Sequence, residues 1–141
     1  MNLFLYFLSS FITAITIPNG RIYHTSVLKK NKVWIIGGLE KPLNDNIRTC
    51  EEDATGKLAE GLWKYDIVNN TWEFEDTPFV GKRGSNALIN KEGEVFVFGG
   101  GTTDPKSPHY SIPVPEMWKF SNDAWSEIKT NSPPIYGHTS A

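Results

Sequence analysis

The side chains of this sequence that could do chemistry are few, and their spacing does not bring them together. The histidines are His24, His109 and His138, and the single cysteine is Cys50. Because His24 and His138 each precede Thr-Ser, their recurrence is explained by a repeated architecture and not by convergent metal ligands. One cysteine also excludes a disulfide within the chain and a zinc site of the CxxC kind. We therefore expect no catalytic residue, no metal ligand and no cofactor in this chain.

The other motifs that suggest ligand chemistry also favour ordinary structural roles. Glu51, Glu52 and Asp53 form the densest acidic cluster. A calcium loop needs alternating carboxylates around a turn glycine, so a solvated loop is the better interpretation. The run Gly99 to Thr103 is rich in glycine but lacks the lysine and the spacing of a phosphate-binding P-loop. No Gly-x-Ser-x-Gly nucleophile elbow occurs in the sequence.

The N-terminal segment Met1 to Ile17 has no charged side chain and is dominated by Leu, Phe and Ile. This composition is typical of the apolar part of a secretory signal peptide. The apolar run is barely long enough to span a bilayer, and Pro18-Asn19-Gly20 then ends it. We expect a signal peptide over residues 1–16, cleaved between residues 16 and 17, although no Lys or Arg stands at its start. A retained membrane anchor and a β-strand over Phe11 to Ile17 are the alternatives.

A signal peptide would make this a secreted protein, or one of the secretory pathway or cell surface. Asn69-Asn70-Thr71 is an N-glycosylation sequon at an expected hairpin tip. Asn69 is therefore the candidate glycosylation site, provided that the chain is exported.

Composition and charge narrow the class of partner. The 141 residues are 39% hydrophobic and 21% charged, which is ordinary for a globular domain. The formal net charge is -2, and no basic run is longer than Lys29-Lys30. The basic footprint that nucleic acids require is thus absent, and so is that of a membrane-surface protein. Soluble proteins and small ligands remain, with membrane attachment only through a retained leader or a C-terminal anchor beyond this sequence.

Beyond Pro18 the sequence is a series of short apolar runs separated by Gly, Pro, Asn and Asp, which predicts an all-β fold. The runs recur in the same order at intervals of about 50 to 60 residues, the period of four-stranded propeller blades. The strands of the first copy are expected at 23–27, 33–36, 62–66 and 71–74. Those of the second copy are expected at 83–87, 95–98, 117–120 and 124–127. A third copy opens at residues 137–141, which repeat the His-Thr-Ser of residues 24–26.

The two copies resemble kelch repeats, in which a Gly-Gly doublet ends an apolar strand and is followed by a tyrosine and then a tryptophan. The first copy carries Gly37, Gly38, Tyr65 and Trp72. The second copy carries Gly99, Gly100 and Trp125, with Phe120 in place of the tyrosine. The resemblance covers about residues 19–141 and implies a fragment of a kelch-type β-propeller. It implies two four-stranded antiparallel blades, at about 20–78 and 81–130, and the first strand of a third at about 135–141.

Such a fold sets expectations for packing. The central strands Val33 to Ile36 and Val95 to Phe98 should be buried on both faces, because each blade is covered by two neighbours. The five tryptophans should pack within or between blades. Propellers contain about 4 to 8 blades, so two blades do not close a ring, and we expect the chain to be incomplete as given.

The expected function is that of an exported scaffold that binds a protein or a glycan. The direction of the strands places the long connections Leu39 to Gly61 and Gly101 to Glu116 at one end of the blades, where long loops commonly carry recognition. The resemblance leaves one alternative, the N-terminal propeller fragment of a secreted galactose-oxidase-like copper radical oxidase. In that family tyrosines and histidines bind copper, and one tyrosine is cross-linked to a cysteine. This copper motif does not map onto the sequence, since Cys50 has no aromatic neighbour in its loop.

Overall fold

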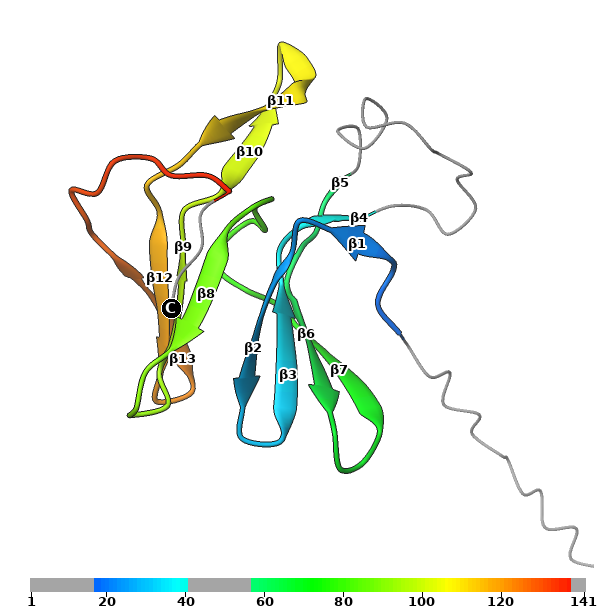
Figure 1. Ribbon diagram of the computed structural model, residues 1–141. Coiled ribbons are helices and arrows are strands. Elements are labelled where there is room, and N and C mark those ends of the chain that lie inside the picture. The colour runs from blue at the N-terminus through cyan, green and yellow to red at the C-terminus, as the bar shows by residue number, and fades with distance from the viewer. Residues whose placement is uncertain (1–16, 41–56, 138–141) are drawn as a thin grey trace, which may run out of the picture.

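The computed structural model describes residues 17–40 and 57–137, which contain strands, turns and connecting segments only. Most strands belong to two four-stranded antiparallel sheets, which we call sheet 1 and sheet 2 (Figure 1). Sheet 1 consists of β2 (Thr25–Lys29), β3 (Lys32–Ile36), β6 (Leu62–Asp66) and β7 (Thr71–Glu75). Sheet 2 consists of β8 (Asn86–Ile89), β9 (Val95–Phe98), β12 (Met117–Ser121) and β13 (Ala124–Ile128). The expected all-β class and the two antiparallel sheets are confirmed.

The two long connections contain strands where the sequence predicted loops. Leu39–Glu40 (β4) pairs with both Arg21–Ile22 (β1) and Lys57–Leu58 (β5). Gly101–Asp104 (β10) and Ser107–Pro113 (β11) form an antiparallel hairpin. Runs this short or this rich in proline carry no strand signal of their own. Proline is tolerated in β11 because an edge strand has one side that needs no ladder hydrogen bond.

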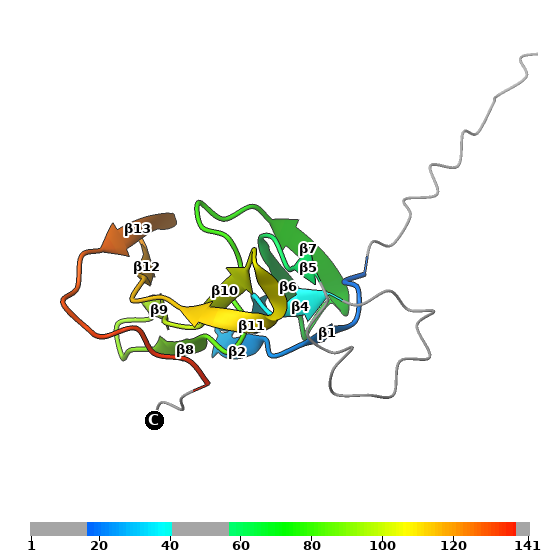
Figure 2. The ribbon, with the colours of Figure 1, turned by 90° about the horizontal axis from the view of Figure 1, so that it is seen from above.

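Sheets 1 and 2 face each other as a wedge. They converge at β2 and β8 and splay apart toward β7 and β13, as Figure 2 shows from above. A hydrogen bond joins the converging strands, in which the Ala87 N–H donates to the Thr25 hydroxyl at 3.1 Å. The wide side of the wedge is filled by Phe79, from the segment that links the sheets. Its ring lies 5.2 Å from Trp118 and 5.0 Å from Trp125, centroid to centroid.

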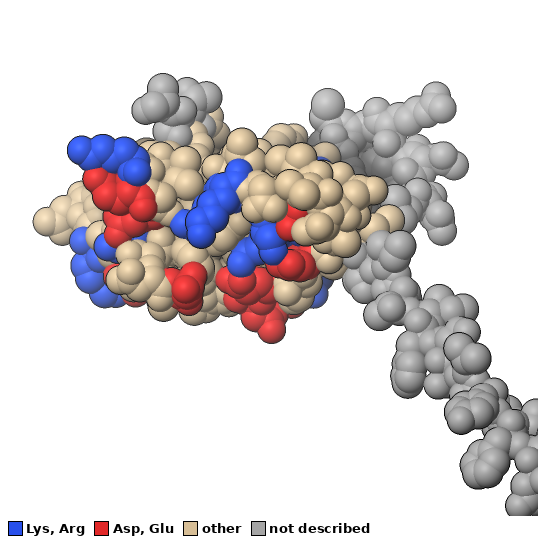
Figure 3. All heavy atoms as spheres, turned by 90° about the horizontal axis from the view of Figure 1, so that it is seen from below, with Lys and Arg blue, Asp and Glu red and all other residues tan. Residues whose placement is uncertain are grey.

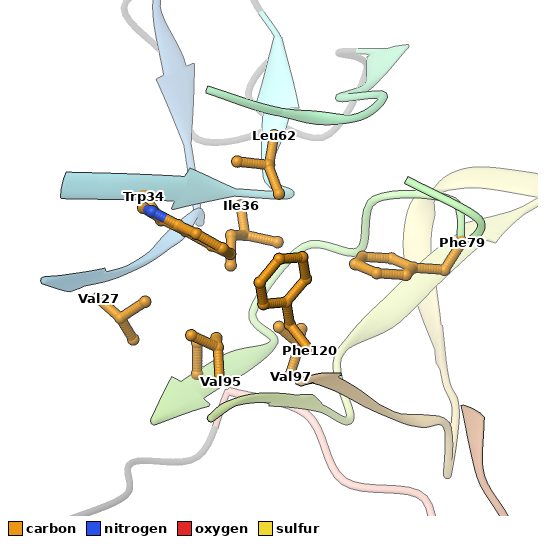
Figure 4. Close-up of a cluster of buried hydrophobic side chains, with 9 residues drawn as sticks. Val27, Trp34, Ile36, Leu62, Phe79, Val95, Val97 and Phe120 are labelled. Carbon is orange, nitrogen blue, oxygen red and sulfur yellow. The ribbon is translucent and has the colours of Figure 1, made fainter. Parts of the chain in front are cut away.

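The hydrophobic core lies between the two sheets (Figure 4). Sheet 1 contributes Val27, Trp34, Ile36 and Leu62, and sheet 2 contributes Ala87, Val95, Val97 and Phe120. The rings of Trp34 and Phe120 meet edge to face, with centroids 4.9 Å apart and planes at 78°. Aromatic pairs in this geometry gain about 0.5–1.5 kcal/mol beyond the burial of their area. All five tryptophans pack within or between the sheets, as expected.

The expectation that both central strands are buried on two faces is wrong for the described residues. In β3, Trp34 and Ile36 are buried, whereas Val33 and Ile35 are partly exposed. β9 alternates in the same way, with Val95 buried and its neighbours on the opposite face partly exposed. The reason is that each sheet faces the other on one side only. Side chains along a strand alternate between the faces, so only every second one is covered.

Cross-strand register shows that the two sheets are equivalent position by position. In sheet 1, Tyr65 lies opposite Trp72, and in sheet 2, Phe120 lies opposite Trp125. The rings of Tyr65 and Trp72 are 4.9 Å apart, and those of Phe120 and Trp125 are 5.2 Å apart, centroid to centroid. The two tryptophans therefore occupy the same place in their sheets and lie on the equivalent face, which points away from sheet 2 in sheet 1 and toward sheet 1 in sheet 2, as the alignment of the copies requires.

The start of each copy also repeats. Tyr23, Gly84 and Gly137 have positive φ angles of 57°, 63° and 63°. The Gly84 N–H donates to the Tyr23 carbonyl at 2.9 Å, and the Gly137 N–H donates to the Gly84 carbonyl at 3.1 Å. Residues 135–137 thus repeat the positive φ and the hydrogen bond of residues 82–84, although they form no strand. Residues 138–141 of the expected third strand lie outside the described part of the chain.

The turn between β6 and β7 is organised by the carboxylate of Asp66. Its Oδ1 accepts the backbone N–H groups of Val68 at 2.9 Å and Asn69 at 3.0 Å. Asn31, from the neighbouring turn, donates to the same oxygen at 3.1 Å, and the Asn69 amide donates to Oδ2 at 3.1 Å. The hydrogen bonds from Asn69 and Val68, with the Asn69 N–H foremost, lower the pKa of Asp66, because they favour the charged carboxylate.

Replacing Asp66 with asparagine should lower the free energy of unfolding at neutral pH, in a manner that depends on pH. Because folding lowers the pKa of Asp66, the stabilisation is complete above the unfolded pKa of about 4 and is lost as the pH falls through the folded pKa. The difference between wild type and Asp66→Asn should therefore be constant from pH 7 to about 5 and shrink at about pH 3. Urea unfolding at these pH values measures it, with exposed Asp76→Asn as control. A difference that grows in acid would contradict the assignment.

Candidate binding surface

The two Gly-Gly doublets end β3 and β9 and turn the chain toward the connections. The φ angles of Gly37 and Gly38 are 68° and 92°, and those of Gly99 and Gly100 are 63° and 90°. The Gly38 N–H donates to the Lys82 carbonyl at 2.8 Å, and the Gly100 N–H donates to the Ile135 carbonyl at 2.8 Å. The second glycine of each doublet thus holds the segment that starts the next copy. Their role in the described structure is to fix the backbone.

Strand direction separates the connections into two sets, at opposite ends of the sheets (Figure 1). The turns β2–β3, β6–β7, β8–β9 and β12–β13 lie at one end. At the other end, which we call the connection end, lie the β10–β11 hairpin and the three-stranded sheet of β1, β4 and β5. Both connections expected to bind a partner, Leu39 to Gly61 and Gly101 to Glu116, leave the sheets there. Residues 41–56, the middle of the first connection, lie outside the described residues.

The first connection is anchored at its base. Leu39 and Ala59 are fully buried, and the Ala59 N–H donates to the Gly38 carbonyl at 2.9 Å. Arg21 in β1 donates to Glu40 in β4 at 3.0 Å, and burial lowers the pKa of its guanidinium, an effect that Glu40 opposes. The ends of this connection are therefore structural.

The β10–β11 hairpin is likewise mounted on a fixed base. Arg83 and Gly101 form a backbone bridge, with N–H to carbonyl distances of 3.2 Å and 2.9 Å, and Arg83 Nε donates to the Ser111 hydroxyl in β11. Farther along β11, Ile112 is 46% exposed. Thr102 lies opposite Ile112 in the register and is partly exposed. The hairpin thus presents Thr102 and the apolar side chain of Ile112 at the surface.

A polar recess of about 330 Å³ lies at the opposite end, between the turns (Figure 3 shows this end). Its wall includes Lys29, whose ammonium donates to the Gly93 carbonyl. It also includes Glu94, which accepts hydrogen bonds from the Ser121 hydroxyl at 2.8 Å and from Asn90 at 2.9 Å. These bonds, with Ser121 first, lower the pKa of Glu94. Lys29 and Glu94 are thus hydrogen-bonded to neutral groups of the surrounding turns, and these bonds stabilise the turns.

The other side chains that could take part in catalysis or metal binding are placed as follows. His24 is exposed at the start of β2, and His109 lies in β11. His138, Cys50 and the acidic cluster 51–53 lie outside the described residues. Among residues 17–40 and 57–137, no three His, Cys, Asp or Glu side chains are grouped so as to hold a metal ion. Nor does a helix able to cross a membrane occur in that part of the chain.

The sequon residue Asn69 lies at the tip of the β6–β7 turn and is exposed. Its side-chain nitrogen, the atom that glycosylation modifies, donates to Asp66 Oδ2 at 3.1 Å. A glycan at this residue would project from the end opposite the connection end, so it would leave the β10–β11 hairpin uncovered.

Comparison with known proteins identifies the fold and no more. No protein-family model matches the chain, and no curated protein matches it. Solved structures do match, among them the structure of YjhT, with a TM-score of 0.56 and 14% sequence identity. The match covers 86% of this chain and 31% of the YjhT chain, so this chain spans about a third of its neighbour's length. At this identity the chain is similar to YjhT in its fold alone.

Proposed function

We propose that sheets 1 and 2 are two consecutive blades of a kelch-type β-propeller. Four features support this proposal. The strands follow one another in sequence order across each sheet, the sheets are equivalent position by position, and they meet as a wedge. The glycine doublets make the same backbone hydrogen bond in both copies. A wedge of two equivalent sheets is the unit that repetition about an axis turns into a propeller.

The function proposed for this propeller unit is that of an exported scaffold that binds a protein or a glycan at its connection end. The observation that carries it is the position of the long connections. The β10–β11 hairpin and the base of the 41–56 segment both lie at this end, whereas the opposite end has tight turns only. Variable connections on a rigid sheet scaffold are the usual place of recognition.

The experiment begins with expression of the full sequence in a secreting cell. N-terminal sequencing of the protein in the medium should give a start near Ile17, and an intact Met1 in a cytosolic fraction would contradict export. The purified chain is then screened on a glycan array and against extracellular proteins. Each hit is measured with wild type and with a variant in which residues 104–110 are replaced by Asn-Gly, which keeps the pairing of Thr103 with Ser111.

The shortened hairpin should bind the hit at least about tenfold more weakly, because it removes contacts without touching the core. Its circular dichroism and melting should match those of wild type. Val68→Asp, at a 75% exposed position in the β6–β7 turn, is the matched control and should bind normally. A hit that binds the hairpin variant, and a second variant shortened within 41–56, as tightly as it binds wild type would exclude the connection end as the binding surface.

A further inference from the structure

Each sheet buries one face against the other and presents an outward face that is partly exposed. The outward face of sheet 1 is apolar on all four strands. It carries Leu28, Val33, Ile35, Tyr65, Trp72 and Phe74. Leu28 is 56% exposed and Phe74 is 49% exposed. The outward face of sheet 2 carries partly exposed Leu88, Phe96, Met117 and Ile128 around Lys119. Apolar surface gathered in this way marks an interaction site.

The outward face of sheet 1 is formed by the same strand positions that form the inward face of sheet 2. Tyr65 and Trp72 occupy in sheet 1 the places that Phe120 and Trp125 occupy in sheet 2. In sheet 2 these two rings pack against Trp34 of sheet 1, with centroids 4.9 Å and 6.3 Å away. The outward face of sheet 1 therefore carries the aromatic pair that docks onto a neighbouring sheet.

The converse holds for the outward face of sheet 2. Leu88 and Phe96, which pair across β8 and β9, occupy the places of Val27 and Trp34, which pair across β2 and β3. Val27 and Trp34 form the part of the core that receives sheet 2. The outward face of sheet 2 thus matches the face of sheet 1 that packs against sheet 2. The contact between the two sheets of one molecule can therefore be repeated between two molecules.

We propose that the chain binds a second copy of itself head to tail, with the outward face of sheet 2 on one copy against the outward face of sheet 1 on the other. The argument rests on the continuity of these faces with the interface inside the molecule, and it does not depend on the proposed export or ligand. Because the two faces differ, the contact is heterologous. Its repetition gives a ring where the rotation closes and a filament where it does not.

A lysine of the internal interface supports the match. The Lys64 ammonium lies 4.3 Å from the Trp34 ring centroid and 5.8 Å from that of Phe120. Lys119 holds the place of Lys64 in sheet 2, directly opposite Phe96. In the docked pair, Tyr65 of the second copy takes the place of Phe120. Lys119 would then lie between Phe96 and that tyrosine, where aromatic faces stabilise a cation.

The docking requires one local exchange. Arg21–Tyr23 starts the first copy as residues 82–84 start the second and residues 135–137 start the third. In the docked pair, Arg21–Tyr23 of the incoming molecule takes the place of residues 135–137 of the receiving one. The Gly100 N–H would then donate to the incoming Arg21 carbonyl and not to Ile135. Because residues 135–137 compete for this place, association between molecules is weaker than the internal interface.

The test measures mass by light scattering after size exclusion, with the chain produced from its full sequence at concentrations on the order of tens of micromolar. Wild type should show masses above that of one chain. Tyr65→Glu and Phe96→Glu place a charge on either side of the proposed contact, and each should raise the dissociation constant at least about tenfold and give monomers. Val68→Glu, an apolar-to-charged change outside both faces, is the control and should associate like wild type.

Mixing the two variants gives the decisive result. Tyr65→Glu keeps an intact face on sheet 2, and Phe96→Glu keeps an intact face on sheet 1, so the mixture should form a one-to-one dimer and nothing larger. Recovery of that dimer also shows that both variants are folded. The proposal is overturned if wild type is monomeric at these concentrations, if either variant alone still forms dimers, or if two folded variants do not pair when mixed.

Discussion

Gly37→Ala is expected to destabilise the chain by about 3–5 kcal/mol, at the upper end of what single substitutions do. Two costs add at this position. The φ of 68° puts an alanine in the left-handed region, which costs about 1–2 kcal/mol. A Cβ built on Gly37 would also lie 2.5 Å from the Lys82 carbonyl oxygen, which is backbone and cannot swing away. That carbonyl accepts the Gly38 N–H, so the clash also strains the bond that holds the next copy.

Two other glycines separate these costs. Gly137 has a φ of 63°, but a Cβ there would have no heavy atom within 4 Å, so Gly137→Ala should show the conformational cost alone. Gly20 has neither a positive φ nor a close contact, so Gly20→Ala should be neutral. Urea unfolding of the three variants should rank them in that order. Equal stability of Gly37→Ala and Gly137→Ala would mean that the Lys82 segment moves aside, and that the doublet does not fix it.

Trp34→Ala is expected to destabilise the chain by about 3–5 kcal/mol and to separate the two sheets. Trp34 is 4% exposed and lies at the centre of the interface. Its ring meets Phe120 edge to face at 4.9 Å and carries the Lys64 ammonium 4.3 Å from its centroid. Removing the indole leaves a cavity that the facing strands cannot close, because their positions are fixed by sheet hydrogen bonds.

Trp72→Ala is the matched control. It removes the same side chain from the outward face of sheet 1, where the indole is partly exposed and packs against Tyr65 and Trp63. In dilute protein its cost should be clearly smaller, because less apolar area is lost from burial. Thermal and urea unfolding compare the two variants. Similar costs would contradict the conclusion that the core lies between the sheets.

The sequence by itself determined the order and place of the main strands. The ends of the eight expected strands lie within three residues of observed strand ends, because short apolar runs bounded by glycine, asparagine and aspartate are local signals. Strand direction then predicted that both long connections share one end. These features depend on residues close together in the chain, so they can be predicted from the sequence without knowledge of the tertiary structure.

Tertiary structure alone decided which strands lie at the connection end and which face of each sheet is buried. The two-residue strands β4 and β5 exist only because β1 and β4 offer partners for their hydrogen bonds. Val33 to Ile36 is apolar throughout, so nothing in its pattern could say that Trp34 is buried while Ile35 is partly exposed. That difference arises because sheet 2 covers one face of sheet 1. The burial of a side chain depends on a neighbour distant in sequence, which a local pattern does not specify.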